Sequence, residues 1–436
     1  MLSSQLIKDA IKKHKLELPR LQKLHNYYIG QNEAILNRKL PDPHKPNNKI
    51  VTVYPKTIVD TVVGFLAAHP LSYISKSNNE KFLDDLRLVN YINNEEDTNA
   101  EIIKSFSIFG KCYELHYTDT QGRIRYNYYS PLEMYVEMDK HDIKFGIRHW
   151  EERLDENTKV IKVEAYDSDG MYRFISHDNG DTFTLDNSEN DYQKEHYYGE
   201  APICVYLNNE EEKGDFESFI PMIDSLDLML SDSANELESW VNSYLLLAGY
   251  KGTTPEDLAK MKQDGILLLD DIAQAKFLTK ETHTEFQQNF FETIDNLIHE
   301  QSSTPRLTSE QFSSNLSGQA LGFKLFGLTT KSSVKERKME RALRKRIRLI
   351  CTMLNKQGKE YDPSDIRFSF VHNIPADEAG ITDQIIKLNH MLPLETRLSW
   401  HPRVQDPAAE IKKLKNESDS SSLDLDLMFK QGGTDE

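Results

Sequence analysis

The sequence predicts an α+β protein with its strands in the N-terminal half and long helices in the second half. Between residues 111 and 207, short strand-like runs such as KVIKVEAY and MYRFIS are separated by Asp- and Gly-rich turn signals. Residues 219–250 instead carry apolar side chains at helical spacing. A polar stretch, 303–317, then leads into another long helical pattern. The pattern over 111–207 is typical of hairpins. The patterns over 219–250 and after residue 317 indicate extended helices.

Helices are also predicted on the N-terminal side of the strands. Residues 1–40 have a helical pattern with a break at Pro19, and an apolar helix over 58–68 is closed by Pro70. One or two further helices are expected over 80–110. These helices and the hairpins together define a first α+β region over residues 1–218.

The predicted helix over 219–250 carries one sign of charge. Its apolar and acidic residues fall on opposite sides of a helical wheel, and the segment has no Lys, Arg or His. At 1.5 Å per residue it would be about 45 Å long. It is either a surface helix of a bundle or one of several copies lining a pore, where repulsion keeps an anionic polymer from sticking. Its acidic positions are Asp224, Asp227, Asp232, Glu236 and Glu238.

A small αβ module is predicted over 251–283, with a helix start at Thr254 and strands at 265–270 and 275–280. A second acidic helix, 284–303, and a polar loop, 304–317, follow it. A long helix begins at residue 318, within a segment that extends to 373. Its expected hinges are Gly318, Gly322 and Gly327.

The long helix is basic over 331–348, which allows two interpretations. The basic residues either bind nucleic acid or pair with acidic residues of the same chain or of a neighbouring subunit. The net charge of -17 argues against a chain that clamps nucleic acid over its whole surface. An apolar stripe that includes Val334 and Leu343 indicates that one side is packed. The residues assigned to inter-subunit contacts are Lys335, Arg337, Lys338, Arg341, Arg344 and Lys345.

Motifs of catalysis and metal binding are missing from the sequence. There is no GxxxxGK[ST], HExxH or GxSxG motif, and no His pairs with a second ligand at i+3 or i+4 in the way that a metal site would require. Three widely spaced cysteines fit a reducing compartment, and no apolar run reaches the ~18 residues that span a bilayer. We therefore expect no enzyme activity, cofactor, metal or membrane contact.

The order of several motifs resembles phage portal proteins, specifically the SPP1-like portals of tailed phages that infect Gram-positive bacteria. The N-terminal motifs are YYIGQNEAILNR, PNNKIV and IVDTVVGFLAAHPLSY. TPRLTSEQF and SGQALGFKLFGL lie in the middle, and LPLETRLSWHPRVQDPAAEIKKLKNE lies near the C-terminus. Ala68 departs from the pattern, because a Gly is expected before Pro70.

The resemblance implies a portal fold whose parts follow one another along the chain. Residues 1–218 would form the wing, 219–250 and 284–303 the stem helices, and 251–283 the clip. Residues 304–317 would be the tunnel loop, 318–373 the kinked helix that returns to the wing, 374–417 the α-helical crown, and 418–436 a disordered tail. The loop residues expected to contact DNA are Thr308, Ser309, Gln311, Ser313, Ser314, Asn315 and Ser317.

The resemblance also implies a function as the head–tail connector of a virion. Such proteins form rings, typically dodecamers, at one capsid vertex, through which double-stranded DNA is packaged and ejected. The implied partners are the terminase large subunit, the head–tail adaptor, and the major capsid and scaffolding proteins, met first in the host cytoplasm. The alternative function is a soluble nucleic-acid-binding protein that uses the basic helix 331–348.

Overall fold

The computed structural model describes residues 2–306 and 318–415 with gaps. The short gaps are 44, 141, 154–158, 189–191, 242–243, 373–377, 390, 402–403, 405–406 and 408–409, and between 248 and 283 only 256 and 275–278 are described. This part of the chain mixes helices and antiparallel sheets, as expected for an α+β protein. None of its helices combines the length and apolar content needed to cross a membrane.

Five helices precede the sheets: α1 (Ser4–Tyr28), α2 (Glu33–Leu36), α3 (Tyr54–Leu66), α4 (Glu80–Ile92) and α5 (Glu95–Phe109). The side chains of Ser3, Asn32 and Asn79 cap α1, α2 and α4. The break predicted at Pro19 is wrong, because α1 continues through it. Residues on both sides of the proline are buried in separate core clusters, and this packing outweighs the lost backbone hydrogen bond.

Two antiparallel sheets follow, as the turn signals predict. β10 (Ile203–Leu207), β2 (Lys111–Thr118) and β3 (Ile124–Tyr129) form the smaller sheet. The larger sheet has the order β4-β5-β6-β7-β8, with β9 (Gln193–Glu195) also paired to β7. Its other strands are β4 (Met134–Asp139), β5 (Asp142–Arg153), β6 (Lys159–Tyr166), β7 (Gly170–Ser176) and β8 (Thr184–Leu185). The start of α1 packs on the larger sheet.

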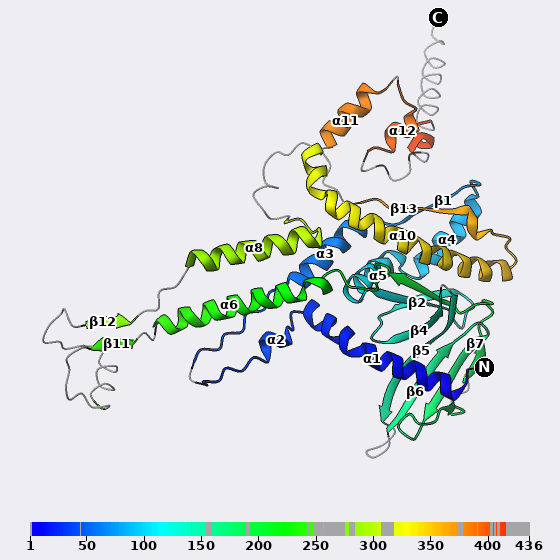
Figure 1. The fold of residues 1–436 in the computed structure, drawn as a ribbon. Helices are drawn as coiled ribbons and strands as arrows, with labels where there is room; N and C mark the ends of the chain where they lie inside the picture. The colour runs from blue at the N-terminus through cyan, green and yellow to red at the C-terminus, as the bar shows by residue number, and fades with distance from the viewer. Residues whose placement is uncertain are drawn as a thin grey trace, which may run out of the picture.

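Two helices, α6 (Ile220–Val241) and α8 (Thr284–Ser302), lie side by side and extend away from the sheets (Figure 1). α6 ends earlier than the predicted residue 250, because β11 (Tyr244–Leu247) pairs with β12 (Ala275–Leu278) beyond it. β12 confirms a strand within the predicted 275–280 run. The predicted strand 265–270 and the helix start at Thr254 lie outside the described residues.

The longest helix, α10 (Gly318–Lys356), crosses back over the smaller sheet and turns in its first part (Figure 1, yellow). β13 (Ile366–Ser369) then pairs with β1 (Ser72–Ser75). α11 (Glu378–Lys387) and α12 (Leu394–Leu398) lie apart from the sheets, near the start of α10 (Figure 1). Both helices lie within the segment 374–417 that was expected to be helical. Residues 418–436 lie outside the described part.

Candidate functional site

The chain that leads into α6 lies directly on the end of α5. Gly110 has φ +91°, and a Cβ atom there would stand 2.0 Å from the carbonyl oxygen of Glu212. A Cβ on Gly214 would stand 2.2 Å from the carbonyl oxygen of Ile108. The Asp215 amide also donates a hydrogen bond of 2.7 Å to a carbonyl of α5. Only glycine permits this close backbone contact, which fixes where the helix pair begins.

A buried ion pair joins α10 to this junction. Lys335 Nζ lies 2.8 Å from Asp215 Oδ2 and also donates to Ser107 and Asn208. Burial lowers the pKa of Lys335 to about 8, while Asp215 acts to raise it. Burial acts to raise the pKa of Asp215, but Lys335 and Lys331 hold it at about 2. Both groups are therefore charged at neutral pH.

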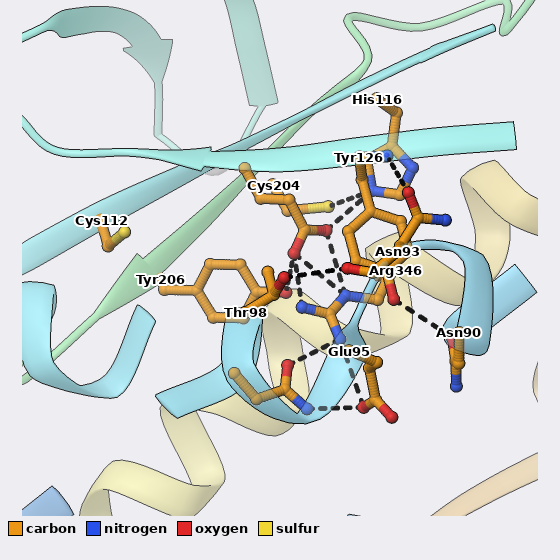
Figure 2. Close-up of polar contacts among 12 residues, drawn as sticks. Asn90, Asn93, Glu95, Thr98, Cys112, His116, Tyr126, Cys204, Tyr206 and Arg346 are labelled. Carbon is orange, nitrogen blue, oxygen red and sulfur yellow. Dashed lines mark hydrogen bonds and ion pairs between the residues drawn. The ribbon is translucent and has the colours of Figure 1, made fainter. Parts of the chain in front are cut away.

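A second buried cation, Arg346, joins α10 to the smaller sheet and α5 (Figure 2). Its Nε atom donates to both carboxylate oxygens of Glu114 at 3.1 Å, and Nη1 donates to Asn99 at 2.8 Å. Its guanidinium also lies 4.8 Å from the ring centre of Tyr126. Burial acts to raise the pKa of Glu114, but Arg346 and His116 lower it to about 2.

Glu114, His116 and Cys204 offer three potential metal ligands within 4.8 Å of one another. The helix-spacing rule did not find this group, because its members come from alternate residues of β2 and from facing β10. Glu114 already accepts hydrogen bonds from Arg346, His116 and Tyr206. A metal dication would compete with that guanidinium. The donor set therefore fits a hydrogen-bonded core better than a metal centre.

The acidic residues predicted on α6 face another part of the same chain. Asp227 is fully buried and accepts hydrogen bonds from Asn32 and from the amide and hydroxyl of Thr52, at 2.6–2.9 Å. Asp224 accepts from Tyr27 and Asn32. Burial is the main cause that raises the pKa of Asp227. The prediction that Asp227 lines a channel is therefore wrong.

The same segment continues along α6, and we call residues 32–52 the strap. Arg38 Nη1 lies 2.7 Å from Asp232, and the Asn48 amide group donates to Glu238 at 2.7 Å. Glu236 accepts from Gln287 of α8. Of the five predicted acidic residues, Glu238 is exposed and the side chain of Asp232 is half exposed. A helical wheel could not show this, because the strap precedes α6 by nearly two hundred residues of sequence.

The exposed face of α8 is acidic and polar apart from Phe286, and its residues were not among those predicted to line a channel. The helix contains no Lys or Arg. Its exposed positions include three glutamates among amide and hydroxyl side chains, namely Glu285, Gln288, Asn289, Glu292, Thr293, Asn296, Glu300 and Gln301. Part of this face is visible in the sequence, because Thr293, Asn296 and Glu300 lie on the opposite side of a helical wheel from the buried Asp295 and Ile298.

The predicted DNA-contacting loop residues, Thr308 to Ser317, lie outside the described part, but both ends of the loop are described. Ser303 adopts φ +55°, and the Thr304 amide donates to the His299 carbonyl, which closes α8. Arg306 forms an ion pair with the buried Asp295. Lys331 of α10 donates to the Ser302 carbonyl at 3.2 Å. The first end of the loop is thus anchored where α8 ends, and α10 passes close to this point at Gly327 and Lys331.

The three predicted hinge glycines lie inside the continuous helix α10. A Cβ on Gly327 would stand 3.3 Å from Cβ of Ser303, so this glycine permits the close approach of α10 to the end of α8. Gly322 has open space around it. Hinge motion at Gly318, Gly322 and Gly327 stays a prediction.

Most basic residues of α10 pair within the chain. The inter-subunit assignment is wrong for Lys335, which is buried, and stays a prediction for the other five residues. Lys335 is buried against Asp215 as described above. Lys338 pairs with Glu210, Lys345 with Glu200 at 3.3 Å, and Arg344 with Glu340 at 2.7 Å. Of the six assigned residues, only Arg337 and Arg341 are exposed with no carboxylate within 4 Å in the described part of the chain. The predicted stripe is also wrong at Val334, which is 42% exposed.

Comparison with known proteins identifies the family. Residues 7–422 match the model of the phage portal protein family, SPP1 Gp6-like, so the chain belongs to this family of portal proteins. A curated relative, the portal protein of Clostridium phage phiCD119, is 25% identical over 226 residues. That match covers 50% of this chain and 49% of the relative, so the chain spans about half the length of that relative.

Two solved structures show partial similarity. One is the neck of an empty gene transfer agent (GTA) particle, with 11% identity and a TM-score of 0.44 over 80% of this chain and 90% of that one. The other is the virion of a native GTA particle, with 12% identity and a TM-score of 0.46 over 88% and 93%.

Proposed function

We propose that this protein is a portal subunit that forms a ring, typically a dodecamer, at one capsid vertex. Double-stranded DNA would be packaged and ejected through the channel of the ring. The family match over residues 7–422 carries this proposal. The paired helices α6 and α8, which extend away from the sheets as a stem would, support it (Figure 1).

The parts of a portal subunit are assigned as follows. The wing comprises residues 1–218, and α10 returns to it within 318–373. α6 and α8 are the stem, and the chain between them, including β11 and β12, is the clip. Residues 304–317 are the tunnel loop and 374–417 the crown. The anchored junction of α5, α6 and α10 would hold the stem at a fixed angle to the wing.

The wall that faces DNA is the exposed side of α8. Its glutamates repel phosphate, and its amide and hydroxyl groups are uncharged, so no cation would hold the polymer in place. The acidic side of α6 faces the strap. It would add to the negative electrostatic potential of the channel without facing DNA directly. The loop residues 308–317 would contact DNA transiently through hydroxyl and amide groups.

The proposed partners follow from this role. The ring would bind the terminase large subunit during packaging, the head–tail adaptor afterwards, and the capsid and scaffolding proteins during assembly in the host cytoplasm. The chain itself would perform no catalysis, because the motor that drives DNA is a separate protein. In the mature virion the ring would remain at the portal vertex.

Negative-stain microscopy and mass photometry of the purified full chain test the proposal. We expect rings with a central hole and a mass that is a whole multiple of 50.5 kDa. A strictly monomeric particle that binds DNA tightly and releases it with salt would instead support the nucleic-acid-binding alternative.

A further inference from the structure

The exposed residues of α10 form one continuous stripe. Phe323 and Phe326 are 81% and 68% exposed, and Val334 is 42% exposed. Toward the C-terminal end the same side of the helix carries arginines. Spacings of three and four residues place all of these positions on one side of a helix. We call this the outer stripe: Phe323, Phe326, Thr330, Val334, Arg337, Arg341, Arg344 and Arg348.

The opposite side of α10 packs against the rest of the chain. Leu325, Leu328, Met339 and Leu343 are buried in the core, and the cations Lys335 and Arg346 are buried beside their carboxylates. The outer stripe is therefore not needed to hold α10 on the subunit. Large aromatic side chains exposed on such a stripe are typical of a binding surface.

The two halves of the outer stripe differ in chemistry. The first half is apolar, and the second half holds four arginines. Arg344 and Arg348 have carboxylate partners in the chain but remain 72% and 52% exposed. Arg337 and Arg341 have none within 4 Å in the described part. Phenylalanine and arginine are both enriched in protein–protein interfaces.

We infer that the outer stripe docks against a second copy of this chain. Charge complementarity favours this occupant, because each copy has a net charge of -17 and the arginines are a local excess of positive charge. DNA would pair with the arginines but would leave Phe323, Phe326 and Val334 in contact with water. A contact between the stripe and a different surface of the neighbour is heterologous, and such contacts form a ring when the rotation between neighbours closes. The inference rests on the proposed ring.

The test compares two charge-reversal variants of the full chain. Arg337→Glu/Arg341→Glu changes the stripe, and Lys12→Glu/Lys15→Glu makes the same change of charge on exposed positions of α1. Circular dichroism and thermal melting check that both variants fold. We expect the arginine variant to need at least about tenfold more protein for half-maximal ring formation by mass photometry. The α1 variant should assemble like the wild type.

A second variant, Phe323→Ser/Phe326→Ser, tests the apolar half in the same assay and should also weaken assembly. Unchanged assembly of both folded stripe variants would overturn the inference while leaving the ring proposal intact. Unchanged assembly with weaker DNA binding would overturn it in favour of a nucleic-acid surface. A monomeric wild type would overturn the inference and the proposed ring together.

Discussion

The sheet-facing side of α10 and the strap-covered face of α6 both hold buried charged groups, but the two regions neutralise them differently. Under α10, Lys335 and Arg346 each contact a carboxylate, so positive and negative charges cancel. On α6, Asp224 and Asp227 accept hydrogen bonds from Tyr, Asn and Thr, which satisfy the oxygens without removing the charge. The first arrangement fixes α10 on the sheet, and the second lets α6 keep its negative charge.

Removal of the guanidinium of Arg346 should cause the largest loss of stability. Arg346→Met leaves Glu114 buried without its cation, so we expect a loss of about 3–5 kcal/mol in the free energy of unfolding, measured in urea. The double variant Glu114→Gln/Arg346→Met should recover most of this loss. Equal destabilisation by the single and double variants would show that the ion pair is not the cause.

Lowering the pH should destabilise the ion pairs under α10 but stabilise the buried Asp227 of α6. The pKa values of Glu114 and Asp215 are about 2 in the folded protein, below their unfolded values, so their stabilisation is present at neutral pH and is lost as pH falls from about 4.5 toward 2. The pKa of Asp227 is raised, so its protonation stabilises the fold as pH falls.

Variants in each region would separate these contributions across a urea series from pH 7 to pH 3. In Asp215→Asn the free energy of unfolding should fall less as the pH is lowered than in the wild type. In Asp227→Asn it should fall more. Parallel curves for the two variants would contradict the contrast between the regions.

Loss of one neutral hydrogen-bond donor from the strap to α6 should have a smaller effect on the free energy of unfolding. Thr52→Val removes the hydroxyl that donates to Asp227 at 2.6 Å but keeps the shape, so we expect a loss of about 1–3 kcal/mol in unfolding free energy. Thr57→Val is the matched control, because its hydroxyl is exposed on α3 and bonds only a backbone carbonyl. Equal losses in the two variants would show that Asp227 does not depend on this donor.

The smallest effect on stability should come from the exposed side of α8. Glu292→Lys should change unfolding by less than about 1 kcal/mol but slow DNA packaging at low salt, because a cation on the wall attracts phosphate. Glu292→Gln controls for loss of the carboxylate alone. An unchanged packaging rate at low salt for the lysine variant would argue against α8 as the wall.

Local patterns in the sequence predicted most of the elements. The hairpins between residues 111 and 207, α8 and the long α10 follow directly from periodicity and turn residues. Contacts between distant segments were not predictable in this way. Asp227 is buried because Thr52 and Asn32 happen to cover it, and Lys335 is buried because α10 crosses the junction at Gly110 and Gly214. One-dimensional charge patterns cannot distinguish such residues from solvent-facing ones.

The most direct test is a cryo-electron microscopy map of the assembled full chain. The account predicts a ring in which the side of α8 that carries Glu285, Glu292 and Glu300 faces the central channel, while the strap separates α6 from it. A ring with α8 turned away from the channel, or an assembly without a channel, would contradict the account.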